Sequence, residues 1–275
     1  MNKEESLVSE NDLQHDGELT LFEGKPFTGT SVDYYKNGQK KSERIYKDGK
    51  ENGLSAGWYE NGEKSHEYYY KDGEANGLWS RWYPNGQMTF EKNYENGELE
   101  NRFIAWYENG QVKFEKYFRF GDLDGGWTKW FESGQKEYEL YYENGWKDCQ
   151  WYENGNKQCE RDLNEYGRLN GVLTKWYESG EKMLEVHHKS EGKESHTSWY
   201  KNGQKHIQTY YKYIEHEYEN RRKDGHVNRE TGEKMVEDGL RTEWDEDGRK
   251  SLERYYSRGE KKGLLRTLLY KLLGI

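Results

Sequence analysis

The sequence predicts an all-β fold: an elongated single-layer antiparallel β-meander, a solenoid of hairpin repeats of about 24 residues, with a short C-terminal capping helix. Three observations predict it. A glycine-centred motif recurs at a nearly constant interval, Trp and Tyr are concentrated beside it, and only 2 of 275 residues are Pro. The mean hydropathy of −1.41 is typical of disorder. However, 25 Tyr and 11 Trp indicate a folded chain in which aromatic rings supply the buried area.

The repeated motif is an aromatic pair followed by Asn-Gly or Ser-Gly. The first five turn glycines lie 24 residues apart, the next three intervals are 21, 25 and 23 residues, and weaker copies follow at Gly232 and Gly248. Asn-Gly favours a two-residue type I′ turn, and the flanking residues suit strands. We therefore predict a hairpin at each copy. The turn glycines are Gly38, Gly62, Gly86, Gly110, Gly134, Gly155, Gly180 and Gly203.

A second glycine signal lies between the copies, as in KDGKENG around Gly49 and KDGEANG around Gly73. Asp-Gly and Asn-Gly pairs reverse a chain in the same way. We expect these pairs to connect one hairpin to the next, so that the array from residue 17 to residue 260 is a continuous meander.

The hairpin register predicts two aromatic columns. If Asn61-Gly62 forms the loop, Tyr59 faces Lys64, Trp58 faces Ser65, and the two rings point to opposite faces. Each ring is expected to stack on its equivalent in the next repeat. Two interpretations stay open: the columns form the core of a thin sheet, or one of them is an exposed aromatic platform for a ligand. The candidate surface comprises Trp58, Trp82, Trp106, Trp130, Trp151, Trp176, Trp199, Tyr59, Tyr83, Tyr107, Tyr152, Tyr177 and Tyr200.

The two cysteines lie in one predicted hairpin. With Asn154-Gly155 as its loop, Cys159 faces Gln150 and Cys149 faces Glu160, so the thiols point to opposite faces. This geometry argues against a disulfide between them.

Two segments depart from the repeat. Residues 1–16 are expected to form a flexible leader. Residues 205–243 lack the Trp-Tyr pair and contain extra residues. Two interpretations of this irregular segment stay open: a decayed repeat with a longer loop, or an insertion that contacts a specific partner.

The C-terminal segment 261–275, KKGLLRTLLYKLLGI, has the leucine spacing of an amphipathic helix and is basic. Three roles stay open for it. It caps the open edge of the array, it docks into a partner, or it attaches to a membrane surface.

Charge and motifs exclude several function classes. The chain has 43 basic and 52 acidic residues, a balance of −9 that is not the footprint of a nucleic-acid-binding protein. We find no nucleophile, phosphate-loop or cofactor motif, so the expectation is that the protein is not an enzyme and binds no cofactor. Six histidines crowd residues 187–226 without a metal-ligand spacing. No apolar leader or membrane span is visible, and we expect a cytoplasmic location.

The unit W-Y-x-N-G-x-K followed by D-G-x-x-N-G resembles the MORN repeat variant, in particular the YwqK-type group assigned as antitoxins of bacterial toxin–antitoxin systems. Residues 21–39, LFEGKPFTGTSVDYYKNGQ, resemble the first repeat of that group. The resemblance covers residues 17–204 well and residues 205–260 poorly. It implies a non-catalytic scaffold for protein–protein interaction whose partner is a basic toxin, and it carries no catalytic residues.

Overall fold

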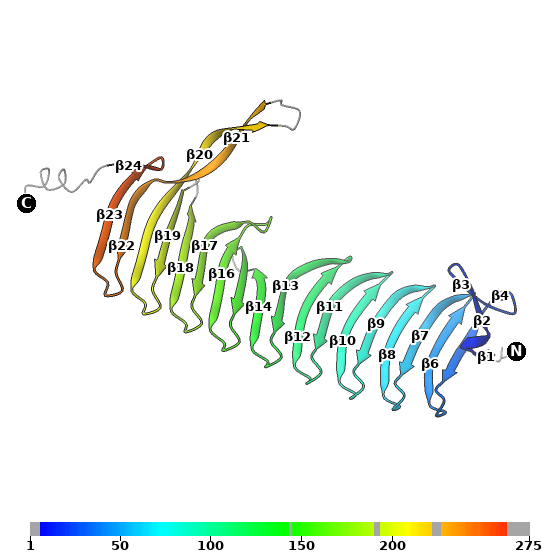
Figure 1. The fold of residues 1–275 in the computed structure, drawn as a ribbon. Coiled ribbons are helices and arrows are strands. Elements are labelled where there is room, and N and C mark those ends of the chain that lie inside the picture. The colour runs from blue at the N-terminus through cyan, green and yellow to red at the C-terminus, as the bar shows by residue number, and fades with distance from the viewer. Residues whose placement is uncertain (1–5, 143–144, 190–192, 222–226, 263–275) are drawn as a thin grey trace, which may run out of the picture. The chain divides into compact units, whose positions relative to one another are not determined.

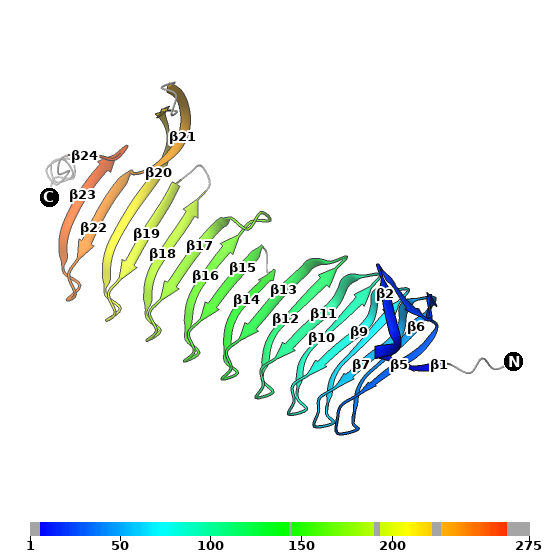
Figure 2. The ribbon, with the colours of Figure 1, turned by 45° about the vertical axis from the view of Figure 1, so that its right-hand side comes forward.

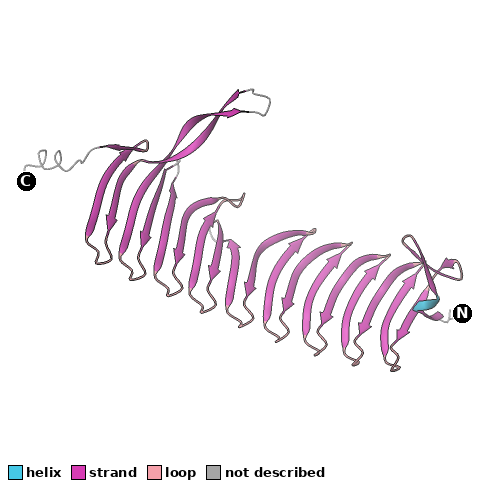
Figure 3. Ribbon diagram, viewed as in Figure 1, coloured by secondary structure: helices cyan, strands magenta, loops and turns pink. Residues whose placement is uncertain are grey.

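The computed structural model describes residues 6–142, 145–189, 193–221 and 227–262. The chain forms two compact units, residues 1–139 and residues 140–275. In each unit the described residues are almost all in strands, and these form an open, single-layer antiparallel meander of hairpins (Figures 1 and 3). The predicted all-β meander of antiparallel hairpins is confirmed.

The first unit contains nine successive strands in which each pairs antiparallel with the next. A further strand, β14 (Lys136–Tyr142), begins in this unit and ends in the second. The nine strands are β5 (Gly29–Tyr34), β6 (Lys40–Lys47), β7 (Lys50–Trp58), β8 (Lys64–Lys71), β9 (Glu74–Trp82), β10 (Met88–Glu95), β11 (Glu98–Trp106), β12 (Val112–Arg119) and β13 (Asp122–Trp130).

The loop at each of the eight turn glycines of the repeated motif has three residues, so the two-residue turn predicted there is wrong. The Gly62 amide donates to the Tyr59 carbonyl at 2.9 Å, and the Tyr59 amide donates to the Glu63 carbonyl at 2.8 Å. Gly62 has φ +89°, whereas Asn61 is not among the residues with positive φ. This is a type I turn followed by a left-handed glycine, the usual form of a three-residue hairpin loop.

The longer loop displaces the register by one residue, and a bulge restores it. Trp58 pairs with Lys64 rather than with Ser65, the ladder then shifts, and Gly57 pairs with His66 as predicted. The predicted register is therefore wrong at the Trp and right for the rest of the strand.

Two-residue turns occur at the second glycine signal. Asp48 and Gly49 have φ +50° and +83°, and Asp72 and Gly73 have φ +52° and +88°, the positive pair of a type I′ turn. Phe120 and Gly121 have the same pair of positive φ values, +52° and +80°, so this second turn forms without Asp or Asn before the glycine.

Residues 6–16 are ordered, which corrects the expected flexible leader. Strand β1 (Ser6–Ser9) pairs parallel with β5 and covers the first edge of the sheet. A 3-10 turn, η1 (Glu10–Asp12), leads into a small sheet of β2 (Leu13–Asp16), β3 (Leu19–Phe22) and β4 (Lys25–Pro26) beside the first hairpins (Figure 2). Leu13, Phe27 and Tyr46 form a buried cluster there.

The second unit repeats the pattern with one large departure. Its strands are β15 (Trp146–Trp151), β16 (Lys157–Leu163), β17 (Leu169–Trp176), β18 (Lys182–Lys189), β19 (Lys193–Trp199), β20 (Lys205–Arg221), β21 (Val227–Glu237), β22 (Gly239–Trp244), β23 (Lys250–Ser257) and β24 (Glu260–Lys262).

The irregular segment 205–243 contains a long hairpin rather than a long loop. The first residues of β20 pair with β19 and β22, and its remainder, from Tyr211 to Arg221, pairs with β21. The β20–β21 hairpin therefore extends beyond the neighbouring strands of this unit (Figure 1).

The predicted C-terminal helix does not begin at residue 261, because Lys261 and Lys262 pair with β23 as part of β24. Residues 263–275, which carry the leucine pattern, lie outside the described residues.

We expect Gly62→Ala to lower the free energy of unfolding by about 1–2 kcal/mol, because a left-handed backbone is costly for a residue with a Cβ. The cost is conformational, since the added Cβ would meet only the Gln39 side chain, at 3.4 Å. Gly62→Asn should cost less, because Asn tolerates this backbone. Denaturant unfolding followed by circular dichroism checks the order; equal losses for Ala and Asn would contradict this account.

Candidate binding faces

The sheet has two faces that differ in chemistry. Face A carries the repeat positions of Trp58, Lys64 and Glu67, which pair or contact one another across the hairpin. Face B carries the alternate positions, such as His66 and Tyr68. This division follows from the two-residue period of strands, with the bulge adding one residue per hairpin.

The tyrosine column links neighbouring repeats through its hydroxyl groups. The Tyr59 hydroxyl donates to the backbone carbonyl of Trp82 at 2.7 Å. The Trp carbonyl lies at the end of its strand, where the ladder shifts. The same bond joins Tyr35 to Trp58, Tyr83 to Trp106, Tyr107 to Trp130, Tyr152 to Trp176, Tyr177 to Trp199 and Tyr200 to Trp244.

The turn asparagines make a parallel set of links. The Asn61 side-chain oxygen accepts from the Glu63 amide at 3.1 Å, and its side-chain nitrogen donates to the Pro84 carbonyl of the next loop at 2.8 Å. Asn37, Asn85 and Asn202 repeat both bonds. The side-chain amide, rather than a tolerance of positive φ, is therefore the reason for Asn at this position.

Among the ring contacts of the described residues none joins two tryptophans of the column, which corrects the expected continuous ladder of rings. Equivalent positions lie two strands apart, about 9.6 Å, whereas ring contacts need about 4.5–7 Å. A lysine fills the gap: Lys40 Nζ lies 5.1 Å from the Trp58 ring centroid, and Lys182 Nζ lies 5.6 Å from that of Trp199. Cation–π contacts thus replace the predicted ring contacts.

A glutamate column runs beside these lysines on face A. Lys40 pairs with Glu43 at 2.5 Å, and Lys136 pairs with Glu139 at 2.7 Å. The pattern changes at strands β10 and β12, where Met88 and Val112 occupy the lysine position. The Glu91 side chain forms no ion pair or hydrogen bond with any of the described residues.

Face B of the first unit holds the rings that do contact one another. Tyr68 stacks on Trp79 with centroids 4.2 Å apart, and Phe103 meets Phe114 edge to face at 5.0 Å. Further contacts join Trp79 to Tyr94 at 4.9 Å. The candidate residues chosen from the sequence lie outside this cluster.

Two lysines are set into this cluster. Lys92 Nζ lies 5.4 Å from the ring centroid of Trp79 and 5.6 Å from that of Phe103, and it donates to the Tyr94 hydroxyl at 2.8 Å. Lys116 Nζ lies 4.7 Å from the centroid of Trp127. Both side chains are half-buried.

The sequence reasoning missed face B because it followed the strongest identities, which lie next to the turns. A sequence signal for face B exists, but it is weaker than the repeated motif at the turns. Six positions after the first four turn glycines the chain has Arg44, Tyr68, Lys92 and Lys116, and the strands opposite the last three supply aromatic residues at matched positions.

In the second unit, a buried carboxylate bridges two imidazoles. Glu194 Oε1 lies 2.7 Å from His188 Nδ1, and Glu194 Oε2 lies 2.9 Å from His196 Nε2. Burial acts to raise the pKa of Glu194, but hydrogen bonds with His196, His188 and Tyr213 lower it below its ordinary value.

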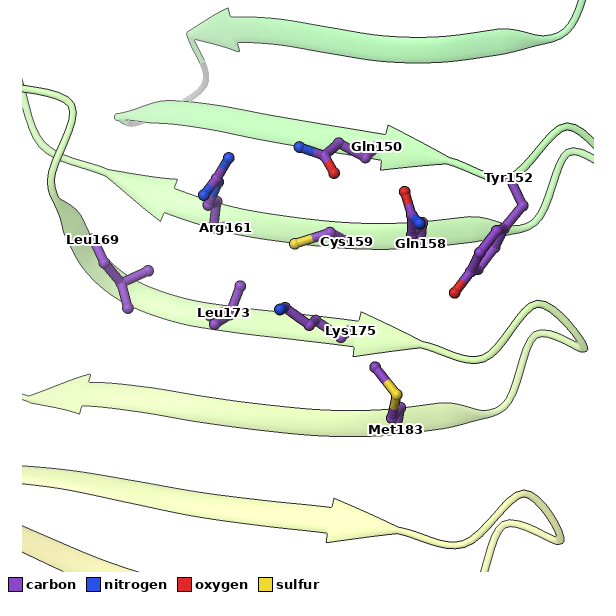
Figure 4. A pocket seen from close by; sticks show the side chains of 9 residues that line it. All are labelled: Gln150, Tyr152, Gln158, Cys159, Arg161, Leu169, Leu173, Lys175 and Met183. Carbon is purple, nitrogen blue, oxygen red and sulfur yellow. The ribbon is translucent and has the colours of Figure 1, made fainter.

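A shallow pocket of about 380 Å³ lies on β15–β18 of the second unit and is lined by Cys159, Arg161, Leu173 and Lys175, among others (Figure 4). Burial raises the pKa of the Cys159 thiol, so the group stays a poor nucleophile. Cys149, also buried, pairs with Glu160, while Cys159 pairs with Gln150, as predicted.

Across the described ranges, no cluster of three or more His, Cys, Asp or Glu side chains is arranged to hold a metal ion. His216 and His226 lie in a segment whose side chains the structure does not describe. Within the same described ranges there is no helix with the length and apolar character needed to cross a bilayer.

The model of the MORN repeat variant matches residues 27–48, 75–96, 99–119 and 123–146. Four segments of this chain are thus similar to the MORN repeat variant. Each match spans one hairpin around a three-residue loop, and MORN-variant repeats of this kind indicate a repeat scaffold for protein interaction. No enzyme family is indicated, and a search of curated proteins finds no match.

Among solved structures, the chain is similar to TcdB2–TccC3, with 9% identity and a TM-score of 0.21, and to a Photorhabdus luminescens Tc holotoxin pore, with 9% identity and a TM-score of 0.19. The alignments cover 85% and 84% of this chain but only 16% and 17% of those chains.

Tyr59→Phe should destabilise the protein by about 0.5–1.5 kcal/mol, because it removes the hydrogen bond to the Trp82 carbonyl and keeps the ring. Tyr69→Phe is the matched control, since Tyr69 is 43% exposed. Comparing the two unfolding midpoints checks the effect. Equal midpoints would show that the hydroxyl ladder contributes nothing.

Glu194 should make stability depend on acid pH. Its pKa is lowered in the folded state, so its contribution is complete above its ordinary value of 4.5 and is lost as pH falls through the folded value. Glu194→Gln should therefore flatten the pH dependence of the unfolding midpoint as pH falls below the ordinary glutamate pKa of 4.5. Glu165→Gln, in an exposed loop of the same unit, should leave the pH dependence unchanged, and an unchanged slope for Glu194→Gln would contradict the prediction.

Proposed function

We propose that this protein is a non-catalytic scaffold that binds a protein partner on face A of its first unit, and that the partner is a basic toxin which the protein neutralises. The MORN-variant repeats support the scaffold role. The toxin rests on the resemblance of the repeat unit to the YwqK-type group of antitoxins.

The observation that carries the proposal is the interruption of the lysine column. Between Trp82, Trp106 and Trp130 the intervening positions are Met88 and Val112 instead of lysine. All five side chains are half-buried, and they lie on five neighbouring strands, a stripe about 19 Å long. An apolar, aromatic stripe with a polar rim is typical of protein interfaces.

The rim of this stripe is acidic. Glu67, Glu91 and Glu115 occupy equivalent positions on the same face. Glu67 is paired with Lys64, and Glu115 is paired with Arg102, so Glu91 is the carboxylate of the three with no pairing to a described cation. An acidic rim around aromatic anchors favours a basic partner and speeds its association.

The proposal is tested by co-expressing the protein with the product of the gene next to its own in the native genome. We expect growth arrest by the neighbour alone and rescue by this protein. Trp106→Ala and Glu91→Lys should each weaken the purified complex about tenfold or more, as is usual for a central aromatic anchor or a reversed charge.

Glu108→Lys makes the same charge change in an exposed loop and should leave binding nearly unchanged. Binding should also weaken with rising salt, because the rim charges are screened. A harmless neighbour, or variants that all bind equally well, would refute the proposal.

A further inference from the structure

A single row of paired residues crosses face B of the first unit. Its strand-to-strand partners are all in register: Arg44 faces Ser31 and Ser55, Lys92 faces Trp79 and Phe103, and Lys116 faces Phe103 and Trp127. We call this set, Ser31, Arg44, Ser55, Tyr68, Trp79, Lys92, Phe103, Lys116 and Trp127, the cation row. Cations and rings alternate along its second half.

The first cation of the row is already occupied by an acidic segment of the same chain. Glu10, in the turn after β1, lies 2.6 Å from the Arg44 guanidinium, and the Ser31 hydroxyl donates to its other carboxylate oxygen at 2.5 Å. Ser31 is fully buried under this contact. The protein therefore already binds a carboxylate to this row, from a segment of its own chain that precedes the repeats.

The two later cations have no such carboxylate. Within the described part of the chain, neither Lys92 nor Lys116 forms an ion pair, and each is held against rings instead. Both are half-buried, so a carboxylate that reached them would meet a partly desolvated ammonium, where a charge-assisted hydrogen bond is stronger than at a fully exposed site.

The distance between Lys92 and Lys116 determines how far apart two carboxylates of one ligand must lie to reach both lysines. Lys92 and Lys116 lie on strands two apart, about 9.6 Å in the direction of the sheet hydrogen bonds. Three residues of a polyproline II helix span about 9.3 Å and make one full turn, so side chains i and i+3 point to the same side. Carboxylates at positions i and i+3 of a peptide in this conformation therefore match both lysines, with the peptide backbone between them over Phe103.

We propose that the cation row on strands β9–β13 binds an acidic peptide of a partner in the polyproline II conformation, with one carboxylate on Lys92, another on Lys116, and the peptide backbone between them across the Phe103 ring. This site lies on the face opposite to the interface proposed above, and it does not depend on the toxin role.

Fluorescence anisotropy with a labelled peptide tests the site in the full-length protein. The probe is an N-acetylated, C-amidated peptide containing Glu-Pro-Leu-Glu between Gly-Ser flanks. We expect saturable binding that weakens about tenfold with Lys92→Met and with Lys116→Met, the loss of one charge-assisted contact each. Met keeps the apolar stem among the rings, and Lys92→Arg should retain binding.

Three controls make the outcome decisive. Lys71→Met, an exposed lysine of β8, should bind the probe like the parent protein. A peptide with Gln in place of both Glu, and an isomer with the two Glu adjacent, should bind at least tenfold more weakly. Trp106→Ala, on face A, should leave peptide binding unchanged, which separates this site from the proposed function.

Equal binding of the adjacent-Glu isomer would overturn the proposal, since it would show attraction by net charge without spacing. So would a loss with Lys71→Met as large as the loss with Lys92→Met, or equally tight binding of a single-stranded oligonucleotide of the same charge. Circular dichroism of each variant establishes that lost binding is not lost folding, and a folded Lys92→Arg protein that fails to bind would also count against the site.

Discussion

Seven tyrosines beside the turns each donate a hydrogen bond to the tryptophan carbonyl of the following repeat, and this is the contact that links the repeats of the architecture. The bulge after each three-residue loop ends the regular ladder at the Trp. Its carbonyl then needs a donor from elsewhere, because an unpaired backbone group at a half-buried site is costly. The tyrosine hydroxyl of the preceding repeat reaches this carbonyl, and the half-buried ring holds the hydroxyl in position. The Asn side chains tie the same loops together one step further out.

The same bulge determines which chemistry reaches which face. It places Trp, Lys and Glu together on face A, and it sends the next positions of each strand, including Tyr68, Lys92 and Phe103, to face B. A single-layer sheet has no second layer of secondary structure to bury either of its faces. The side chains on both faces therefore stay half-exposed. Cation–π contacts between lysines and aromatic rings provide the stabilisation that apolar packing between layers provides in a two-layer protein.

Much of this fold follows from the sequence, because the glycine period, the aromatic flanks and the Asp-Gly signals each predict hairpins independently. The three-residue loop at Asn61-Gly62 was not predictable from the dipeptide alone, since Asn-Gly serves both loop types: Asn96-Gly97 forms a two-residue turn between Glu95 and Glu98. The cluster around Lys92 was missed for a related reason. Its residues differ from repeat to repeat, and only the register brings them into one row.

The ladders also govern how such a chain changes in length. The tyrosine and the asparagine beside each turn, as at Tyr59 and Asn61, find their partners one period further along, and these partners are backbone carbonyls that every repeat supplies. Removal or duplication of one whole period rejoins every link, whereas loss of a single residue inside a strand would exchange the two faces beyond it. A change in length inside a strand is therefore disfavoured, and the addition or removal of one whole repeat moves the sites on both faces by the width of one hairpin.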